Sequence, residues 1–146
     1  RNLNRLARWG LNVPHPRGVH KNVLVMDYVG SAASPSPKLR DVAIEDPQAV
    51  YDDLLKFLAV SWQKASLVHG DFSPYNILWH DGRACVIDVG QGVVDSHPKA
   101  QEFLVRDVTR LVEWGQKNDL DVDLAGAMYE VLNMDLSDVE QVELLE

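Results

Sequence analysis

The segment LVHGDFSPYNILW, residues 67–79, constrains the fold of this chain more than any other. Its ends are apolar and strand-like, while His69, Asp71 and Asn76 lie between them in a stretch that also contains glycine and proline. Short apolar runs bounded by glycine and proline favour buried strands. The segment is therefore expected to be a polar loop between two strands, with a carboxylate and an amide five positions apart.

A second carboxylate ends the next apolar run. Residues 77–88 form two apolar runs joined by an Asp-Gly dipeptide, which is typical of a hairpin turn. Asp88 stands at the end of the second run, twelve positions after Asn76. Read singly, Asp71, Asn76 and Asp88 could be turn formers or strand caps. Their common spacing around one hairpin is not explained by those separate roles.

The rest of the chain has mainly helical patterns. Apolar residues recur at helical spacing in four ranges, and a capping-box pair of Ser and Glu predicts a fifth helix. The expected helices are residues 1–9, 46–64, 98–116, 121–132 and 137–145. Residues 18–29 predict two short strands, and the Ser/Ala/Pro-rich stretch after them predicts an exposed connector. The expected fold class is α+β.

Composition excludes several kinds of protein. The chain has 146 residues, about the size of one domain, and no apolar run approaches the roughly 18 residues of a membrane span, so no membrane partner is expected. Nine carboxylates and no lysine or arginine lie between Asp119 and Glu146, so this end is not expected to bind nucleic acid directly. Cys85, the only cysteine, is expected to be a buried strand thiol, which suits a cytoplasmic location.

The three polar residues fit the needs of phosphoryl transfer. That chemistry needs a positioned acceptor hydroxyl and oxygen ligands that hold Mg²⁺ on the phosphates. Protein kinases use an Asp, a metal-binding Asn five positions later, and a second metal-binding Asp after a hairpin. Asp71, Asn76 and Asp88 follow this pattern, and an amide oxygen with a carboxylate is an ordinary ligand pair for Mg²⁺.

The same region resembles the RIO family of atypical serine/threonine protein kinases, particularly its first branch. The resemblance is carried by the loop residues Ser73, Tyr75 and Asn76, by Ile-Asp-Val at 87–89, and by several positions farther along the chain. These are Gln91, Val93, His97-Pro98, Ala100, Leu104 and Arg106-Asp107. Upstream, RNLNRL and VLVMDYVG resemble the end of a family helix and the nucleotide hinge, so the resemblance covers about residues 1–117.

By this resemblance, the chain should have a protein-kinase-like fold and use ATP with Mg²⁺. Asp71 would be the catalytic aspartate, and Asn76 and Asp88 would be the Mg²⁺ ligands. Relatives in this family look like kinases or ATPases that act in small ribosomal subunit maturation. The resemblance therefore implies a protein substrate or a pre-ribosomal particle as partner.

The resemblance also implies an adenine site and a division into lobes. Met26 would guard the adenine pocket, and the backbone of Asp27 and Val29 would bind the edge of the adenine ring. Residues 1–30 would be the end of the N-terminal lobe with its hinge strand, and residues 31–46 a connector. Residues 47–146 would form the helical C-terminal lobe.

Three departures from ordinary protein kinases stand out. Gly70 replaces the usual arginine, so no cation is expected there to bind a phosphorylated activation loop, and GVVDSHP leads into a helix without an Ala-Pro-Glu segment. The glycine-rich loop, its lysine and the partner glutamate are not found in this sequence. Because the chain opens on Arg1 without methionine, we expect these parts upstream and expect this stretch alone to bind ATP weakly and to be inactive.

Two alternatives remain open. A small-molecule phosphotransferase of the aminoglycoside or choline kinase type shares HGD and the Asn at plus five, but usually has Gly-Asn and Gly-Asp-Pro where this chain has Tyr75-Asn76 and DVGQGVV. A non-catalytic binding module could use a nucleotide only as a conformational switch. Such a module would gain nothing from keeping Asp71, Asn76 and Asp88 together.

Overall fold

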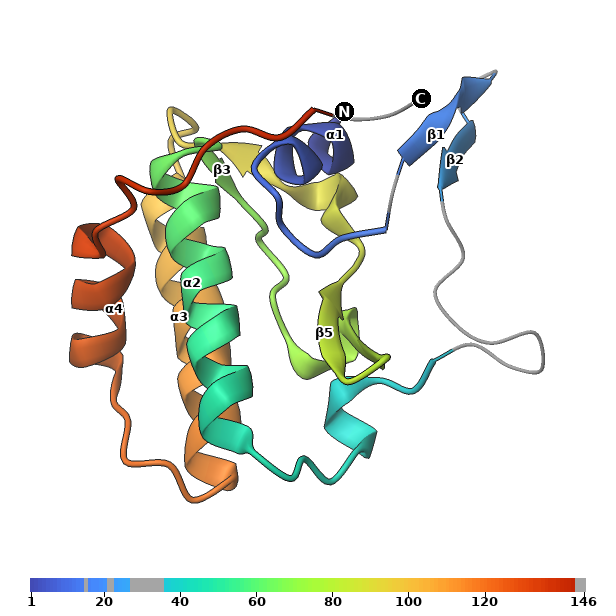
Figure 1. Cartoon of the computed structure of the whole chain (residues 1–146). Helices are drawn as coiled ribbons and strands as arrows, with labels where there is room; N and C mark the ends of the chain where they lie inside the picture. The colour runs from blue at the N-terminus through green and yellow to red at the C-terminus, as the bar shows by residue number, and fades with distance from the viewer. Residues whose placement is uncertain (15, 21–22, 27–35, 144–146) are drawn as a thin grey trace.

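The structure is a computed structural model that describes the backbone of residues 1–14, 16–20, 23–26 and 36–143, and the side chains of 1–14 and 36–143. Figure 1 shows the arrangement of its helices and strands. The elements follow in the order α1 (Asn2–Arg8), β1 (Pro16–His20), β2 (Val23–Met26), η1 (Leu39–Asp41), α2 (Pro47–Gln63), β3 (Leu67–Val68), η2 (Pro74–Asn76), β4 (Ile77–His80), β5 (Arg83–Val86), η3 (Val89–Gln91), β6 (Val93–Val94), α3 (Ala100–Lys117) and α4 (Leu124–Asn133).

Four of the five predicted helices are confirmed. Gly10, with φ of +74°, follows the end of α1, where a left-handed residue ends a helix most easily. The carboxylate of Asp46 accepts a hydrogen bond from the Ala49 N–H at 3.2 Å and caps α2, whose first residue is Pro47. Sequence patterns therefore located these helix ends because their stop and start signals are local.

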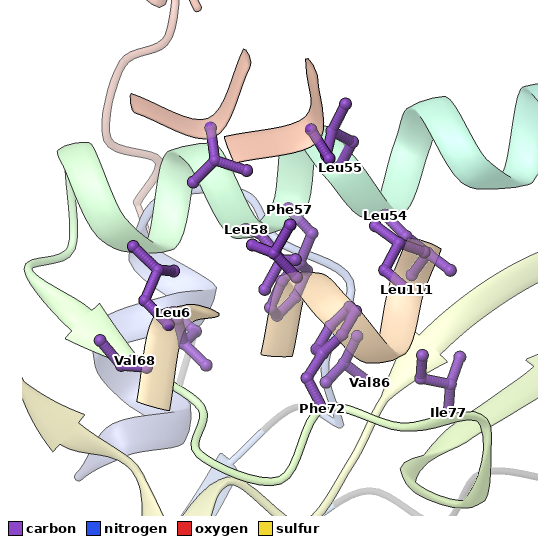
Figure 2. Packing of buried hydrophobic residues seen from close by; sticks show 14 of the residues in the cluster. Leu6, Leu54, Leu55, Phe57, Leu58, Val68, Phe72, Ile77, Val86 and Leu111 are labelled. Carbon is purple, nitrogen blue, oxygen red and sulfur yellow. The ribbon is translucent and has the colours of Figure 1, made fainter. Parts of the chain in front are cut away.

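Helices α2, α3 and α4 pack together around the main core. α2 packs against both α3 and α4, and Figure 1 shows α2 and α3 side by side with α4 flanking them. Figure 2 shows Leu54 of α2 close to Leu111 of α3, and Val86 of β5 beside Phe72 of the polar loop. The loop that carries the candidate site is therefore anchored in the main core by one of its own residues.

The described strands form three separate antiparallel pairs, β1–β2, β3–β6 and β4–β5. The β4–β5 hairpin turns at Asp81 and Gly82, which have φ of 51° and 72°, as the Asp-Gly dipeptide predicted. Cys85 in β5 is buried as expected, and burial raises the pKa of its thiol to about 11. The pairing of β3 with β6 had no local sequence signal, and it brings the loop after β3 next to the turn after β5.

The predicted helix over residues 137–145 is wrong for the described part of that range, which ends at residue 143. The chain after α4 instead runs back across α2 to α1, as the red segment of Figure 1 shows. The N–H of Val142 donates to the carbonyl oxygen of Arg8 at 2.6 Å, and Leu136 packs against Ala59 and Val60. These long-range contacts outweigh the local capping-box preference, because an amphipathic helix needs a face to bury.

Among the described residues, no helix is both long enough and apolar enough to cross a lipid bilayer. The expected lobe boundary near residues 29–36 lies almost entirely outside the described residues. Of the expected connector, residues 31–46, the structure describes residues 36–46, which include η1.

The returning segment after α4 should contribute to stability through Leu136. We expect Leu136→Ala to lower the free energy of unfolding by about 2–5 kcal/mol, because the side chain is only 4% exposed and its removal leaves a cavity against α2. The matched control is Leu132→Ala, whose leucine is 46% exposed on α4 and should change stability by less than about 0.5 kcal/mol. Urea denaturation measures both, and equal losses would contradict the packing of this segment.

Candidate active site

The polar loop between β3 and β4 is held by an aromatic anchor. Phe72 is 1% exposed, and its ring lies 5.7 Å from the ring of Phe57 and edge-on to the ring of His69 at 5.8 Å. Figure 2 shows Phe72 among the core side chains. Because Phe72 is buried, the adjacent Asp71 is left half-buried at the surface of the loop, where a reacting group could approach it.

Both ring nitrogens of His69 are hydrogen-bonded, one within this loop and one to the residue that follows β5 by one position. Nδ1 accepts a hydrogen bond from the Asp71 N–H at 3.1 Å, and Nε2 lies 2.9 Å from the Ile87 carbonyl oxygen. A neutral imidazole with its proton on Nε2 satisfies both bonds. Ile87 directly precedes Asp88, so His69 joins the backbone of the loop to the end of the hairpin.

The side chain of Asn76 orients Asp71. Its amide nitrogen donates to the backbone carbonyl oxygen and to Oδ2 of Asp71, both at 2.9 Å. These bonds use the amide nitrogen and leave Oδ1 of Asn76 available as an oxygen ligand. The Ile87 N–H also donates to the Asn76 carbonyl oxygen at 2.8 Å, which places Asp88 one residue beyond the pairing. The structure thus links Asp71 directly to Asn76, and links the backbone of Asn76 to the residue that precedes Asp88.

Asp88 occupies a strained backbone position. Its φ and ψ are 60° and 51°, a left-handed conformation that non-glycine residues adopt at a cost of roughly 1–2 kcal/mol. Its side chain makes no capping hydrogen bond to the short helix η3 that follows, and the residue is exposed. A cavity of about 570 Å³ lies beside it, with Arg5 of α1 and Arg1, the residue just before that helix, also in its wall. Such strain is common at functional sites.

A buried carboxylate that the sequence analysis did not assign to the site holds the loop from behind. Asp107 of α3 is 0% exposed, and its two oxygens accept hydrogen bonds from the N–H groups of Gly70 at 2.9 Å and Phe72 at 3.1 Å. Burial raises the pKa of Asp107, while these two bonds and the charge of Arg106 act in the opposite direction. The sequence signal was a lone acid on the apolar face of a predicted helix.

Arg106, the neighbour of Asp107, also reaches the loop. Its guanidinium donates to the Gly70 carbonyl oxygen and lies over the ring of Phe103, 4.7 Å from the ring centre. A cation therefore does lie beside Gly70, supplied from α3 rather than from the loop itself. Because Arg106 binds the backbone of the loop itself, the expectation that no cation here binds a phosphorylated activation loop stays a prediction.

The cluster suits a magnesium ion better than a zinc ion. The described residues contain no group of three or more His, Cys, Asp or Glu that could hold a metal. The amide oxygen of Asn76 and the carboxylate of Asp88 are hard oxygen donors, and Mg²⁺ commonly takes one or two such protein ligands with substrate phosphates and water completing its shell. The residues therefore fit Mg²⁺ bound together with a nucleotide.

The predicted adenine site falls at the edge of the described structure. Met26 is the last residue of β2, where its backbone is paired with Pro16. Asp27 and Val29 lie outside the described residues. Their roles remain the prediction made from the sequence.

Comparison with known proteins gives one consistent family. A family model described as RIO domain matches residues 1–125. The chain is 40% identical over 134 residues to the RIO-type serine/threonine-protein kinase Rio1 of Haloferax volcanii, which covers 92% of this chain and 46% of that protein. It is 33% identical over 147 residues to the serine/threonine-protein kinase RIO1 of Caenorhabditis elegans, which covers 99% of this chain and 29% of that protein.

Solved structures agree on the fold. The Rio2 kinase from Chaetomium thermophilum superposes with a TM-score of 0.70 at 24% identity, over 91% of this chain and 44% of that one. The Rio2 kinase–ADP/Mg²⁺–phosphoaspartate complex from the same organism gives a TM-score of 0.69 at 23% identity, over 91% and 42%. These similarities confirm the predicted α+β, protein-kinase-like fold. The chain spans less than half the length of each of these four proteins.

The buried carboxylate should be a main source of loop stability. We expect Asp107→Ala to lower the free energy of unfolding by about 1–3 kcal/mol for each of the two N–H groups that lose their acceptor. Asp107→Asn keeps one oxygen acceptor and should lose less. Glu113→Ala, an exposed acid on the same helix, is the control and should stay within about 0.5 kcal/mol of the parent. If Asp107→Ala matched Glu113→Ala in urea denaturation, the role of the two bonds would be refuted.

The same residue should give a pH dependence of known sign. Because burial raises the folded-state pKa of Asp107 above the ordinary value of 3.8, the folded protein holds this proton more tightly than the unfolded chain does. The proton-linked part of the contribution of Asp107 to stability is therefore fully present below pH 3.8 and is lost as pH rises through the raised folded value. Urea titrations across this interval should show the slope in the parent and not in Asp107→Asn.

Proposed function

We propose, from the membership of this chain in the RIO family of serine/threonine kinases, that it forms the catalytic part of a protein that transfers or hydrolyses the γ-phosphoryl group of Mg²⁺-bound ATP. The observation that carries this proposal is the amide of Asn76, whose nitrogen holds Asp71 through two hydrogen bonds, while the backbone of Asn76 pairs with Ile87, the residue before Asp88. The same three residue types at the same spacing serve phosphoryl transfer in protein kinases.

Each residue of the cluster has a distinct task in this proposal. Asp71, held by Asn76, orients the acceptor hydroxyl or water and accepts its proton as the new bond to phosphorus forms. Asn76 and Asp88 would hold Mg²⁺, which supplies charge stabilisation for the phosphate oxygens when it is bound. Met26, Asp27 and Val29 would bind the adenine, in line with the sequence resemblance. Because catalysis of phosphoryl transfer depends mainly on positioning, the hydrogen bonds by which His69 and Asp107 hold the loop would contribute to catalysis.

The relatives support the nucleotide and the metal. One Rio2 kinase has been solved with ADP, Mg²⁺ and a phosphoaspartate. The use of ATP and Mg²⁺ by the present protein, and its choice between kinase and ATPase activity, are inferences from that relationship and from the oxygen ligands at Asn76 and Asp88.

The biological setting is also part of the proposal. We place the protein in small ribosomal subunit maturation, in the cytoplasm, with a protein substrate or a pre-ribosomal particle as partner. This fits a chain that lacks the Ala-Pro-Glu segment of a conventional peptide platform. Residues 1–30 would complete the N-terminal lobe and hinge, 31–46 would be the connector, and 47–146 the C-terminal lobe, whose acidic end has no role in binding nucleic acid.

The metal assignment predicts the effect of one change. In the longer protein expected to contain this chain, Asp88→Asn should reduce Mg²⁺-dependent ATP turnover below detection, because the amide lacks the negative charge that holds the metal. The fold should survive, since asparagine tolerates the left-handed conformation. The control is Asp81→Asn, another left-handed aspartate in the same hairpin whose side chain is 88% exposed. Parent-like turnover in Asp88→Asn would remove Asp88 from the metal site.

The acceptor class can be tested through Asp71. We expect Asp71→Ala to slow turnover by about 10²–10⁴-fold, the usual range for a positioned acid–base group. Steady-state ATP consumption by the longer protein should rise with purified pre-ribosomal particles and not with aminoglycosides, choline or homoserine. A positioned small acceptor would raise the rate by orders of magnitude. Strong stimulation by one of these compounds, with none from the particles, would favour a small-molecule phosphotransferase instead.

A further inference from the structure

One side chain of α1 reaches the turn that follows Asp88. The amide nitrogen of Asn2 donates to the carbonyl oxygens of Val89 at 2.8 Å and Gly92 at 3.3 Å. Val89 is the first residue of η3, and Gly92 is the residue that follows the last residue of this helix. A single amide therefore binds both ends of this one-turn helix and ties it to a segment 87 positions away in sequence.

The turn is closely packed around Gly92, where a side chain would not fit. A Cβ atom on Gly92 would lie 3.0 Å from the Val68 carbonyl oxygen, 3.1 Å from that of Val89, and 3.3 Å from Nδ2 of Asn2. Gly92 is thus enclosed between β3, its own turn and Asn2. The Gly92 N–H also donates to the Val89 carbonyl at 3.1 Å, so this oxygen serves both the turn and Asn2.

The hydrogen bonds of Asn2 help to hold the left-handed backbone conformation of Asp88. Left-handed non-glycine residues persist only where the surrounding structure determines them strongly. On one side, Ile87 is held by His69 and Asn76. On the other side, Val89 is held by Asn2. Without the second restraint, Asp88 could relax to an ordinary conformation, and its carboxylate would leave the direction set by the present backbone.

We propose that Asn2 is a positioning residue for Asp88, and that its two hydrogen bonds set the affinity of the site for a divalent cation bound with nucleotide. This inference rests on the proposed function in so far as Asp88 is a metal ligand. Groups that orient a metal ligand without touching the metal commonly change metal affinity by about 10–100-fold when they are removed.

Two variants and one control separate positioning from mere packing. Asn2→Asp keeps the size of the side chain but turns an acceptor oxygen toward two carbonyl oxygens, and Asn2→Ala removes the group. The control is Asn12→Ala, because the Asn12 amide also donates to a carbonyl, that of Ala84 at 2.7 Å, on a strand of the same hairpin. All three variants lose a hydrogen bond from an asparagine amide to the backbone. Only the two Asn2 variants lose it at the turn after Asp88.

The first measurement needs no metal or activity. Hydrogen exchange of the Gly92 amide, followed by NMR in the 146-residue chain, should be at least about tenfold faster in both Asn2 variants than in the parent. Asn12→Ala should leave the exchange of this amide unchanged. Parent-like exchange of Gly92 in both Asn2 variants would overturn the inference.

The second measurement tests the metal. Mn²⁺ titrations in the presence of ADP, followed by electron paramagnetic resonance, should show at least about tenfold weaker Mn²⁺ binding in the Asn2 variants and parent-like binding in Asn12→Ala. Equal weakening in Asn2→Ala and Asn12→Ala would overturn the positioning role. If the parent and Asp88→Asn bound Mn²⁺ equally, the metal site of the proposed function would fail, while the exchange of Gly92 would still decide whether Asn2 holds the turn.

Discussion

The geometry of the site depends on one buried carboxylate. The carboxylate of Asp107 accepts hydrogen bonds from two backbone N–H groups of the loop, those of Gly70 and Phe72, which lie on either side of Asp71. Those N–H groups are buried and have no water to replace a lost acceptor, so the loop conformation is strongly tied to helix α3. The raised pKa of Asp107 reflects what burial costs the charged carboxylate, and the two hydrogen bonds offset part of that cost.

Beyond Asp107, hydrogen bonds from side chains and backbone connect the loop to the residues around Asp88. His69 and Asn76 connect the loop to Ile87, and the residues after Asp88 return to β3 through the β3–β6 pair. The carbonyl oxygen of Gln91 lies 3.6 Å from the place where a Cβ of Gly70 would stand, so the two turns are in contact. A cluster built this way resists displacement of any single residue, which is what catalysis by positioning requires.

The returning segment after α4 shows the limit of local patterns. Residues 137–145 have the spacing of a capping box, yet the described part of this segment is extended over α2 and α1. The acidic residues of this segment face the solvent, since Asp138, Glu140 and Glu143 are all exposed. It did not show which surface the segment would cover, because that depends on Leu136 meeting Ala59 and Val60.

The sequence by itself determined the helices α1 to α4, the hairpin at Asp81 and Gly82, and the three polar residues, because caps, turn dipeptides and apolar periods are local properties of the chain. Met26, Asp27 and Val29 were predicted by resemblance and stay predictions. Only the tertiary structure decided that Asp107, Arg106 and Asn2 serve the same loop and turn. Their hydrogen bonds join segments about 35 to 90 positions apart, and a lone polar residue on an apolar helix face carries no local mark of the distant backbone group that it will bind.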